Sequence, residues 1–355
     1  MQTDLIEEAR RQAQICNACR YCEGYCAVFP SMHSERAFSD GDITQLANLC
    51  HNCRGCYYAC QYTAPHEFDL NLPQALAEVR QDSWADFAWP RPLGKLFHKS
   101  GVALALSVVV ATALILLAFR LFAPAGGEGF YAVMSHSVMV AIFLPAFAFP
   151  FLSLWISLRR YWAATGGGPV TLQALRGATR AVATMKNLAG GHGDGCNFED
   201  EDRFGHARRA AHQLVLWGFA LSFLSTSSGT LLHYVFDAPA PYPLWSLPKL
   251  FGVPGGLMMV GGTVWLANLK LRADPELGAR NAWGGEMGFI LLLFLVAASG
   301  LLLYALGQTA LMPAMLALHL GAVLAFFLLT PFTKMAHGFY RMAALVRDET
   351  RKAQP

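Results

Sequence analysis

The sequence predicts an all-α fold in which a polar helical head is followed by a bundle of six transmembrane helices. Of the 355 residues, 54% are hydrophobic and only 14% are charged, whereas soluble chains carry about a quarter charged residues. The charges are dense before position 100 and sparse after it. The first part also carries few strand signals. These features exclude an ordinary soluble domain and predict a membrane protein with a soluble head.

Residues 1–90 are predicted to form the head, mostly from short helices. We expect a helix over 1–15 and another over 43–49, the second preceded by a turn at Asp40-Gly41-Asp42. Asn71-Leu72-Pro73 is expected to open a further helix that ends near position 83, because Pro is favoured in the first helical turn. The head is therefore expected to be helical throughout.

Eight cysteines of the head form two copies of the motif C-x2-C-x2-C-x3-C. The first copy holds Cys16, Cys19, Cys22 and Cys26, and the second holds Cys50, Cys53, Cys56 and Cys60. This spacing is typical of thiolates that bind a [4Fe–4S] cluster, and in two-cluster ferredoxins the fourth Cys of each run ligates the other cluster. We therefore predict one cluster on Cys16, Cys19, Cys22 and Cys60, and a second on Cys50, Cys53, Cys56 and Cys26.

Three other uses of these cysteines agree less well with the pattern. Zinc sites usually pair Cys or His ligands across a longer loop, a disulfide framework needs an oxidising compartment, and free structural cysteines would not repeat one spacing. In the bacterial ferredoxin run a Pro follows the last Cys, whereas Ala27 and Gln61 follow here. We expect this change to leave the ligands in place, but it puts the usual ferredoxin backbone in doubt.

Six apolar segments follow a linker at 91–100, which we expect at the membrane interface because Trp84, Phe87 and Trp89 precede it. Each segment is long enough for a hydrocarbon core of about 30 Å. The predicted spans are 101–122, 132–158, 210–236, 250–271, 286–307 and 312–333. Pro145 and Pro150 are expected to kink the second span. The bundle is thus predicted over 101–337.

The basic residues predict the orientation of this bundle. They gather in the loop 159–209, near Lys270 and Arg272, and in the tail 338–355, whereas the opposite side has little beyond Arg120 and Lys249. The positive-inside rule therefore predicts a cell inner membrane protein with both termini and the iron–sulfur head in the cytoplasm. We interpret the basic tail as a topology signal and not as a nucleic-acid site.

Four histidines at the ends of the third and sixth spans predict haem. His212 and His233 are 21 residues apart and His319 and His337 are 18 apart, which on helices gives about 31 and 27 Å on similar faces. If these spans run antiparallel, His212 pairs with His337 near the cytoplasmic side and His233 with His319 near the outer side. This arrangement is typical of two bis-histidine b-type haems.

The haem interpretation has alternatives that the residues leave open. A single histidine here could be an interfacial side chain, and His136 competes for the outer haem site. Gly218, Gly229 and Gly321 would admit a flat macrocycle, but small residues are also common at helix contacts in membranes.

Two further features have open roles. The loop G-G-H-G-D-G-C at 190–196 follows no strand, which argues against a nucleotide site. His192 and Cys196 in it could bind a metal, but we favour a loop that contacts a partner or the head. Glu286 could serve proton transfer to a quinone, or could be an interfacial helix start.

Taken together, the two Cys runs and the four histidines resemble the tricarballylate/citrate-utilisation B protein family. G-G-H-G-D-G-C-N-F at 190–198 and R-R-A-A-H at 208–212 also resemble it. The membrane part is similar to the haem-b gamma subunit of respiratory nitrate reductase. The resemblance implies a partner that reoxidises a flavoprotein, typically tricarballylate dehydrogenase. A related arrangement is fused to a flavoprotein in cobalamin synthesis.

We therefore predict an electron-transfer protein rather than an enzyme with its own substrate chemistry. Electrons from a cytoplasmic FAD-dependent dehydrogenase would pass through two [4Fe–4S] clusters and b-type haem to a quinone. The alternatives are a membrane redox sensor, for which the sequence has no output module, and a transporter. Intramembrane charges, which usually mark a transport path, are nearly absent from the spans.

Overall fold

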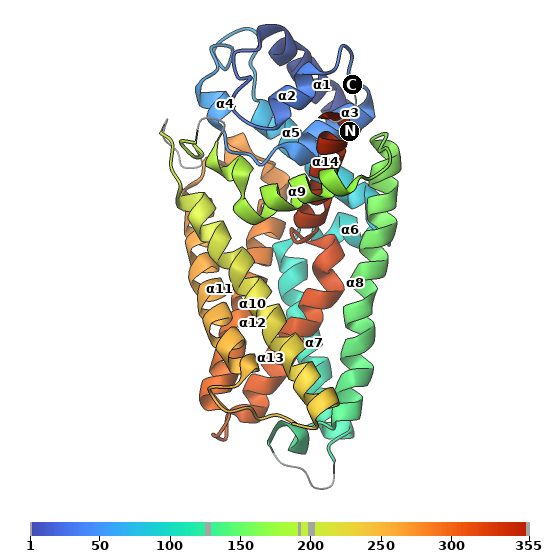
Figure 1. Cartoon of the computed structure of the whole chain (residues 1–355), viewed down its shortest axis with the longest axis vertical. Coiled ribbons are helices and arrows are strands. Elements are labelled where there is room, and N and C mark those ends of the chain that lie inside the picture. Colours follow the sequence, from blue (N-terminus) through green and yellow to red (C-terminus); the bar gives the residue numbers. More distant parts are fainter. Residues whose placement is uncertain (1, 125–128, 191–192, 198–202, 353–355) are drawn as a thin grey trace.

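The computed structural model describes residues 2–124, 129–190, 193–197 and 203–352. The described residues form helices and contain no strand, with one isolated β-bridge between Cys196 and Gly205. A bundle of long helices carries the head at one end, and both ends of the chain lie in that head (Figure 1). The predicted all-α fold is confirmed.

In the part of the chain that the structure describes, six helices are long and apolar enough to cross a membrane. They begin and end within a few residues of the predicted spans. Their bounds are α7 Gly101–Leu121, α8 His136–Ala164, α10 Ala207–Phe236, α11 Leu247–Arg272, α12 Trp283–Leu306 and α13 Met312–Leu329. Large side chains such as Val102, Leu106 and Val109 are exposed on the outside of α7, as expected where lipid replaces water.

Small residues bring the bundle helices together. A Cβ on Gly218 of α10 would lie 2.8 Å from the carbonyl oxygen of Gly255 in α11, and a Cβ on Gly321 of α13 would lie 2.6 Å from Cα of Thr112 in α7. These glycines therefore permit close backbone contacts, as small residues commonly do in membranes. The suggestion that Gly218 and Gly321 make room for a macrocycle is wrong.

Five helices build the head from the N-terminal residues. They are α1 Gln2–Cys19, α2 Val28–His33, α3 Asp40–Leu49, α4 Gly55–Tyr58 and α5 Leu72–Phe87. The expected helices at 1–15 and 43–49 both prove longer. Helix α1 continues through Cys16 and Cys19, and Ser39 caps α3 three residues before Asp42, so Asp40-Gly41-Asp42 is a helix start and not a turn.

The expected interfacial linker is also folded. Residues Arg91–Phe97 form helix α6, and Trp84 is 1% exposed within the head core, where its indole N–H donates to Asn48 Oδ1 at 2.8 Å. Trp84 therefore packs as a core residue and does not lie at the headgroup level.

Two segments from outside 1–90 complete the head. Helix α14 Ala336–Lys352 enters it from the bundle, and α9 Leu172–Thr184 lies along α14 (Figure 1). Tyr340 of α14 and Ala174 of α9 belong to the same buried cluster as Ile43 and Leu76 of the head. The predicted basic tail at 338–355 is thus an amphipathic core helix over its described residues.

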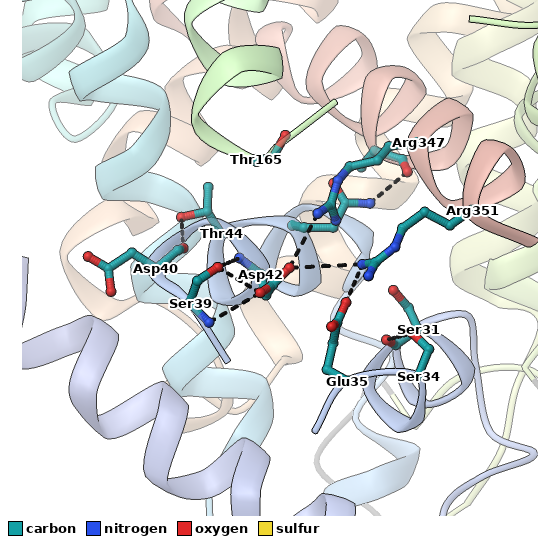
Figure 2. Close-up of polar contacts among 12 residues, drawn as sticks. Ser31, Ser34, Glu35, Ser39, Asp40, Asp42, Thr44, Thr165, Arg347 and Arg351 are labelled. Atoms are coloured by element: carbon teal, nitrogen blue, oxygen red, sulfur yellow. Dashed lines mark hydrogen bonds and ion pairs between the residues drawn. The ribbon is translucent and has the colours of Figure 1, made fainter. Parts of the chain in front are cut away.

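Ion pairs fix α14 against the start of α3 (Figure 2). Arg347 Nη2 lies 3.2 Å from Asp42 Oδ1, and Arg351 pairs with Glu35. Gln45 Nε2 also donates to the carbonyl of Ala344 at 2.8 Å. The last helix of the chain is therefore bonded to the first half of the head.

The sixth span does not continue into α14 as one helix. A 3-10 turn at Thr330–Phe332 follows α13, and Thr333 is extended with φ −117° and ψ −178°. Pro331 explains the break, because a proline cannot continue the helical hydrogen bonds. The prediction that His319 and His337 share one helix, and hence one face, is wrong.

Candidate redox sites in the head and the bundle

The first predicted cysteine set lies around one cavity of the head. Its volume is about 220 Å³, and its lining includes all four predicted ligands, which are Cys16, Cys19, Cys22 and Cys60. Tyr21, which also lines this cavity, is 69% exposed, and Cys19 is exposed. This cavity therefore opens at the surface of the head.

The second predicted set lies around a smaller and deeper cavity. Its volume is about 20 Å³, and its lining includes Cys26, Cys50, Cys53 and Cys56. Cys50 and Cys53 are 9% and 7% exposed. Cys56 lines the first cavity as well, so the two sites are direct neighbours. The structure brings the eight cysteines together around two adjacent cavities, and the crossed division of the ligands between two clusters stays a prediction.

The two cysteine runs also share a backbone feature. Arg20 follows Cys19 with φ 59°, and Arg54 follows Cys53 with φ 68°. A left-handed conformation is uncommon for residues other than glycine and costs free energy unless the surroundings require it. Its recurrence at the same place of both motifs indicates that each run turns sharply around its own site.

Burial and the neighbouring thiols make Cys16 and Cys26 poor acids in the absence of a metal. Burial, followed by the neighbouring thiols of Cys60, Cys22 and Cys19, raises the pKa of Cys16 to about 12. Burial, followed by Cys53 and Cys50, raises the pKa of Cys26 well above its ordinary value. Thiolates packed this closely need a cation between them, and the iron of a cluster supplies one.

Among the described residues, no group of three or more His, Cys, Asp or Glu side chains is arranged to hold a metal ion. A zinc ion would need its thiolates about 2.3 Å from one centre, whereas an iron–sulfur cubane is larger and holds its thiolates further apart. A donor set made of cysteines alone is typical of an iron–sulfur cluster, and the clusters at these two cavities stay a prediction.

The ninth cysteine lies beside the deeper cavity. Cys196 forms a side-chain hydrogen bond with Cys53, and Asn197 N–H donates to the carbonyl of Cys53 at 2.8 Å. The expectation that this loop contacts the head is met by these bonds, whereas His192 lies outside the described residues. The Cys53 contact itself had no signal in the sequence.

At the head end of the bundle, His212 of α10 and His337 of α14 face each other. Their ring centres are 5.9 Å apart. Metal–imidazole distances near 2 Å imply ring centres about 6 Å apart for two histidines on one iron. His337 Nδ1 bonds the carbonyl oxygen of Lys334, a contact that commonly orients a metal-binding imidazole through its other nitrogen. The predicted head-end pair therefore fits a haem iron.

At the far end, the structure pairs different histidines from those expected. The ring of His233 lies 4.2 Å from that of His136, centre to centre, and His136 Nε2 lies 2.9 Å from Tyr234 Oη. His319 Nδ1 instead lies 3.1 Å from Ser299 Oγ. His136, the rival in the sequence, is thus the ring neighbour of His233, and a spacing of 4.2 Å leaves too little room for an iron between them.

Comparison with known proteins adds the family to this geometry. The family model for citrate utilization protein B matches residues 94–355, and the model for its Fer4-like domain matches residues 9–86. The chain belongs to the citrate utilization protein B family. The boundary between the two matches falls between the head and the bundle, where the family's Fer4-like domain ends and its membrane part begins.

One curated member of the family is a relative over almost the whole chain. Citrate utilization protein B of Escherichia coli is 40% identical over 352 residues, which cover 97% of this chain and 92% of the relative. No solved structure matches the chain. The similarity of the membrane part to the nitrate reductase gamma subunit stays a prediction.

Glu286 lies in an ion cluster where the head joins the bundle of this family member. Its carboxylate accepts from Lys270 Nζ at 2.6 Å, from Gln81 Nε2 at 3.0 Å and from Lys334. Two lysine partners stabilise the charged form of the carboxylate. The suggested role in proton transfer to a quinone is therefore less well supported than a structural role that joins α5, α11 and α12.

Proposed function

We propose that this protein is a membrane-bound electron-transfer protein that takes electrons from a cytoplasmic FAD-dependent dehydrogenase and delivers them to the quinone pool. The observation that carries this proposal is the series of donor sets at one end of the molecule. Four cysteines, of which Cys19 is exposed, line a cavity that opens at the surface of the head, and a second set that includes the buried Cys50 and Cys53 lies next to it. The loop of the second set is bonded to the helices that hold His212 and His337.

The cofactors that suit these donors are two [4Fe–4S] clusters and b-type haem, which supply one-electron transfer when bound. The chain's contribution is to hold the thiols and imidazoles. Cys56 lines both cavities, which supports direct exchange between the cluster sites. The outer haem, with His233, His319 or His136 as ligands, belongs to the proposal as a second centre.

The orientation proposed is with the head in the cytoplasm. Arg159 and Arg160 lie in the part of α8 before its end at Ala164, and Lys270 and Arg272 lie in the last turn of α11, all toward the head end. The far end has few basic residues, such as Arg120 at the end of α7. The positive-inside rule then places the head, both termini and the exposed cysteine cavity in the cytoplasm of a cell with an inner membrane.

The proposed donor is a flavoprotein of the tricarballylate dehydrogenase type. The family match supports a role in the utilisation of citrate or tricarballylate. Such a dehydrogenase leaves reduced FAD behind and needs an acceptor. The proposed contact with the donor is the open cavity beside Tyr21 and Cys19. There the reduced FAD of the dehydrogenase would pass electrons to the first cluster of this protein.

Cofactor analysis followed by electron transfer tests this function. The purified protein should contain about eight non-haem iron atoms per chain, as expected for two cubane clusters, and should show the optical bands of b-type haem. Reduced tricarballylate dehydrogenase should bleach the cluster absorbance and reduce the haem, and membranes should then reduce a quinone. Haem-free protein from haem-sufficient cells would contradict the haem part, and iron-free protein would contradict the whole proposal.

A further inference from the structure

The loop that carries part of the buried cysteine site is bonded to two helices of the bundle. Arg208 Nη1 of α10 donates to the carbonyl of Asn52 at 2.6 Å. Arg341 Nη2 of α14 donates to the carbonyl of Cys50 at 2.6 Å. Hydrogen bonds with a charged donor are shorter and about twice as strong as neutral ones. The loop Cys50–Asn52 is therefore fixed to the bundle by two charged hydrogen bonds.

The same two helices carry the head-end histidines. Arg208 precedes His212 by four residues in α10, and Arg341 follows His337 by four residues in α14. Residues four apart lie on one helix face, one turn from each other. Each histidine of the pair is thus separated by one helical turn from an arginine that binds the cysteine loop.

A third arginine joins this contact from the head. Arg80 of α5 donates through Nη1 to the carbonyls of Cys50 at 2.7 Å and of Ala47 at 3.1 Å. The carbonyl of Cys50 therefore accepts from one guanidinium of the head and one of the bundle. Positive charge and hydrogen bonds beside a cluster are among the features that set its reduction potential.

We propose that Arg208 and Arg341 are positioning residues. They fix the loop of the buried cysteine site to α10 and α14, the helices that carry His212 and His337, so that the cluster site and the head-end haem site transfer electrons as one unit. This inference rests on the proposed function. The transfer moves one electron, which the reduced cluster loses and the ferric haem iron gains, and no bond forms or breaks. A donor outside the protein, a reduced flavin, restores the electron to the clusters.

The physical reason for fixing this loop is that electron transfer slows steeply with distance. A loop free to move away from α10 and α14 would spend part of its time too far from the haem site. The arginines limit that movement, and they also place positive charge beside the cluster thiolates. Their removal is expected to change both the rate of transfer and the potential of one cluster.

The test compares the intact protein with Arg208→Gln, Arg341→Gln and their double variant, all purified in detergent. Photoreduced FMN serves as the donor, and Cys50→Ser measures any haem reduction that bypasses the buried cluster. Arg347→Gln is the matched control, because Arg347 lies on α14 and bonds Asp42 and not the cysteine loop. Iron content, haem content and the cluster potentials from an EPR-monitored redox titration are measured on every variant.

At unchanged iron and haem content, the double variant should reduce its haem through the clusters more slowly than the intact protein, because the freed loop would spend part of its time too far from the haem site. The reduction potential of one cluster should become more negative. Arg347→Gln should match the intact protein in both the rate of haem reduction and the cluster potentials. If a glutamine variant loses iron, Arg208→Lys and Arg341→Lys keep the charge with a less rigid bond, and slower transfer in them supports the inference. Unchanged rates and potentials in fully loaded variants would overturn the inference, whereas an intact protein without haem would contradict the haem part of the proposed function instead.

Discussion

The two ends of the bundle hold their histidines in different ways. At the head end, the rings of His212 and His337 are 5.9 Å apart, and their helices are bonded to the cysteine loop. At the far end, the rings of His136 and His233 are 4.2 Å apart, and His319 bonds Ser299 instead. The spacing of the head-end pair agrees with the predicted haem iron, which stays a prediction. His136 and His233 would have to move apart before they could hold one iron.

This difference follows from how each end is built. The head end combines α5, α10, α14 and the cysteine loop, and charged bonds from Arg80, Arg208 and Arg341 link these segments. The far end gathers the first residue of α8, the last turn of α10 and a residue inside α13. A site assembled by several linked segments is more rigid than one assembled at helix ends.

The largest expected effect comes from breaking the buried cysteine site. Cys50→Ser should remove one of the two clusters, so the non-haem iron content should fall by about half. The melting temperature of the head should fall as well, because Cys50 packs in the same buried hydrophobic core as Leu76 and Trp84. Iron and acid-labile sulfide assays and a thermal melt measure both effects.

Cys19→Ser provides the comparison within the head. It should cost iron from the exposed cavity with a smaller loss of melting temperature, since Cys19 is exposed. Full iron content in both variants would mean that these thiols are not the ligands.

Haem ligand variants test the two ends directly. His212→Ala and His337→Ala should each remove the same head-end haem, because each iron needs one imidazole from each helix. The loss of that haem should also stop reduction of any other haem by the clusters. Haem content by the pyridine haemochromogen assay and optical redox titration report these changes.

The far-end variants decide between the expected and the observed partners of His233. Loss of a second haem in His319→Ala but not in His136→Ala would support the pairing expected from the sequence. The reverse would support the contact in the structure, where His136 lies against His233. If no far-end variant changes the haem content, the protein holds haem at the head end alone.

The features that the sequence predicted well are the ones that depend on local patterns. Apolar segments of about 20 residues identified the long helices, and the two repeated cysteine runs do lie together around two adjacent cavities. Pro331 was a readable sign that the helix breaks before His337. The prediction treated the chain from His319 to His337 as one helix. Its conclusion that the two histidines lie on the same helix face was therefore wrong.

Contacts between distant segments could not be predicted in the same way. The Arg208 bond to Asn52 joins residues 156 positions apart, and the Arg341 bond to Cys50 joins residues 291 positions apart. In the sequence, the positive charges of Arg208 and Arg341 indicated only the orientation in the membrane. Charge alone does not say to which carbonyl an arginine will bond. The same holds for α14, whose packing against α3 depends on how the whole chain folds.

The smallest expected effect is a loss of folding stability at the head end as the pH falls. Burial would raise the pKa of Asp42, but hydrogen bonds from Ser39 and Arg347, together with the Arg347 charge, outweigh it and hold that pKa below its usual value. A carboxylate whose pKa is lower in the folded protein stabilises the fold above its unfolded pKa, near 3.9, and this contribution is lost as the pH falls through the folded value.

Asp42→Asn should therefore lower the free energy of unfolding at neutral pH by about 1.5–3 kcal/mol, the usual value of hydrogen bonds to a charged group. The difference from the intact protein should shrink as the pH falls below about 4. Asp40→Asn is the control, because the Asp40 side chain is 74% exposed in its pair with Arg10 and such pairs contribute at most about 1 kcal/mol. Proteolysis of α14 measured against pH reports where the loosening occurs. Cleavage that appears first at the far end of the bundle would contradict the assignment, since the Asp42 contacts hold only the head end together.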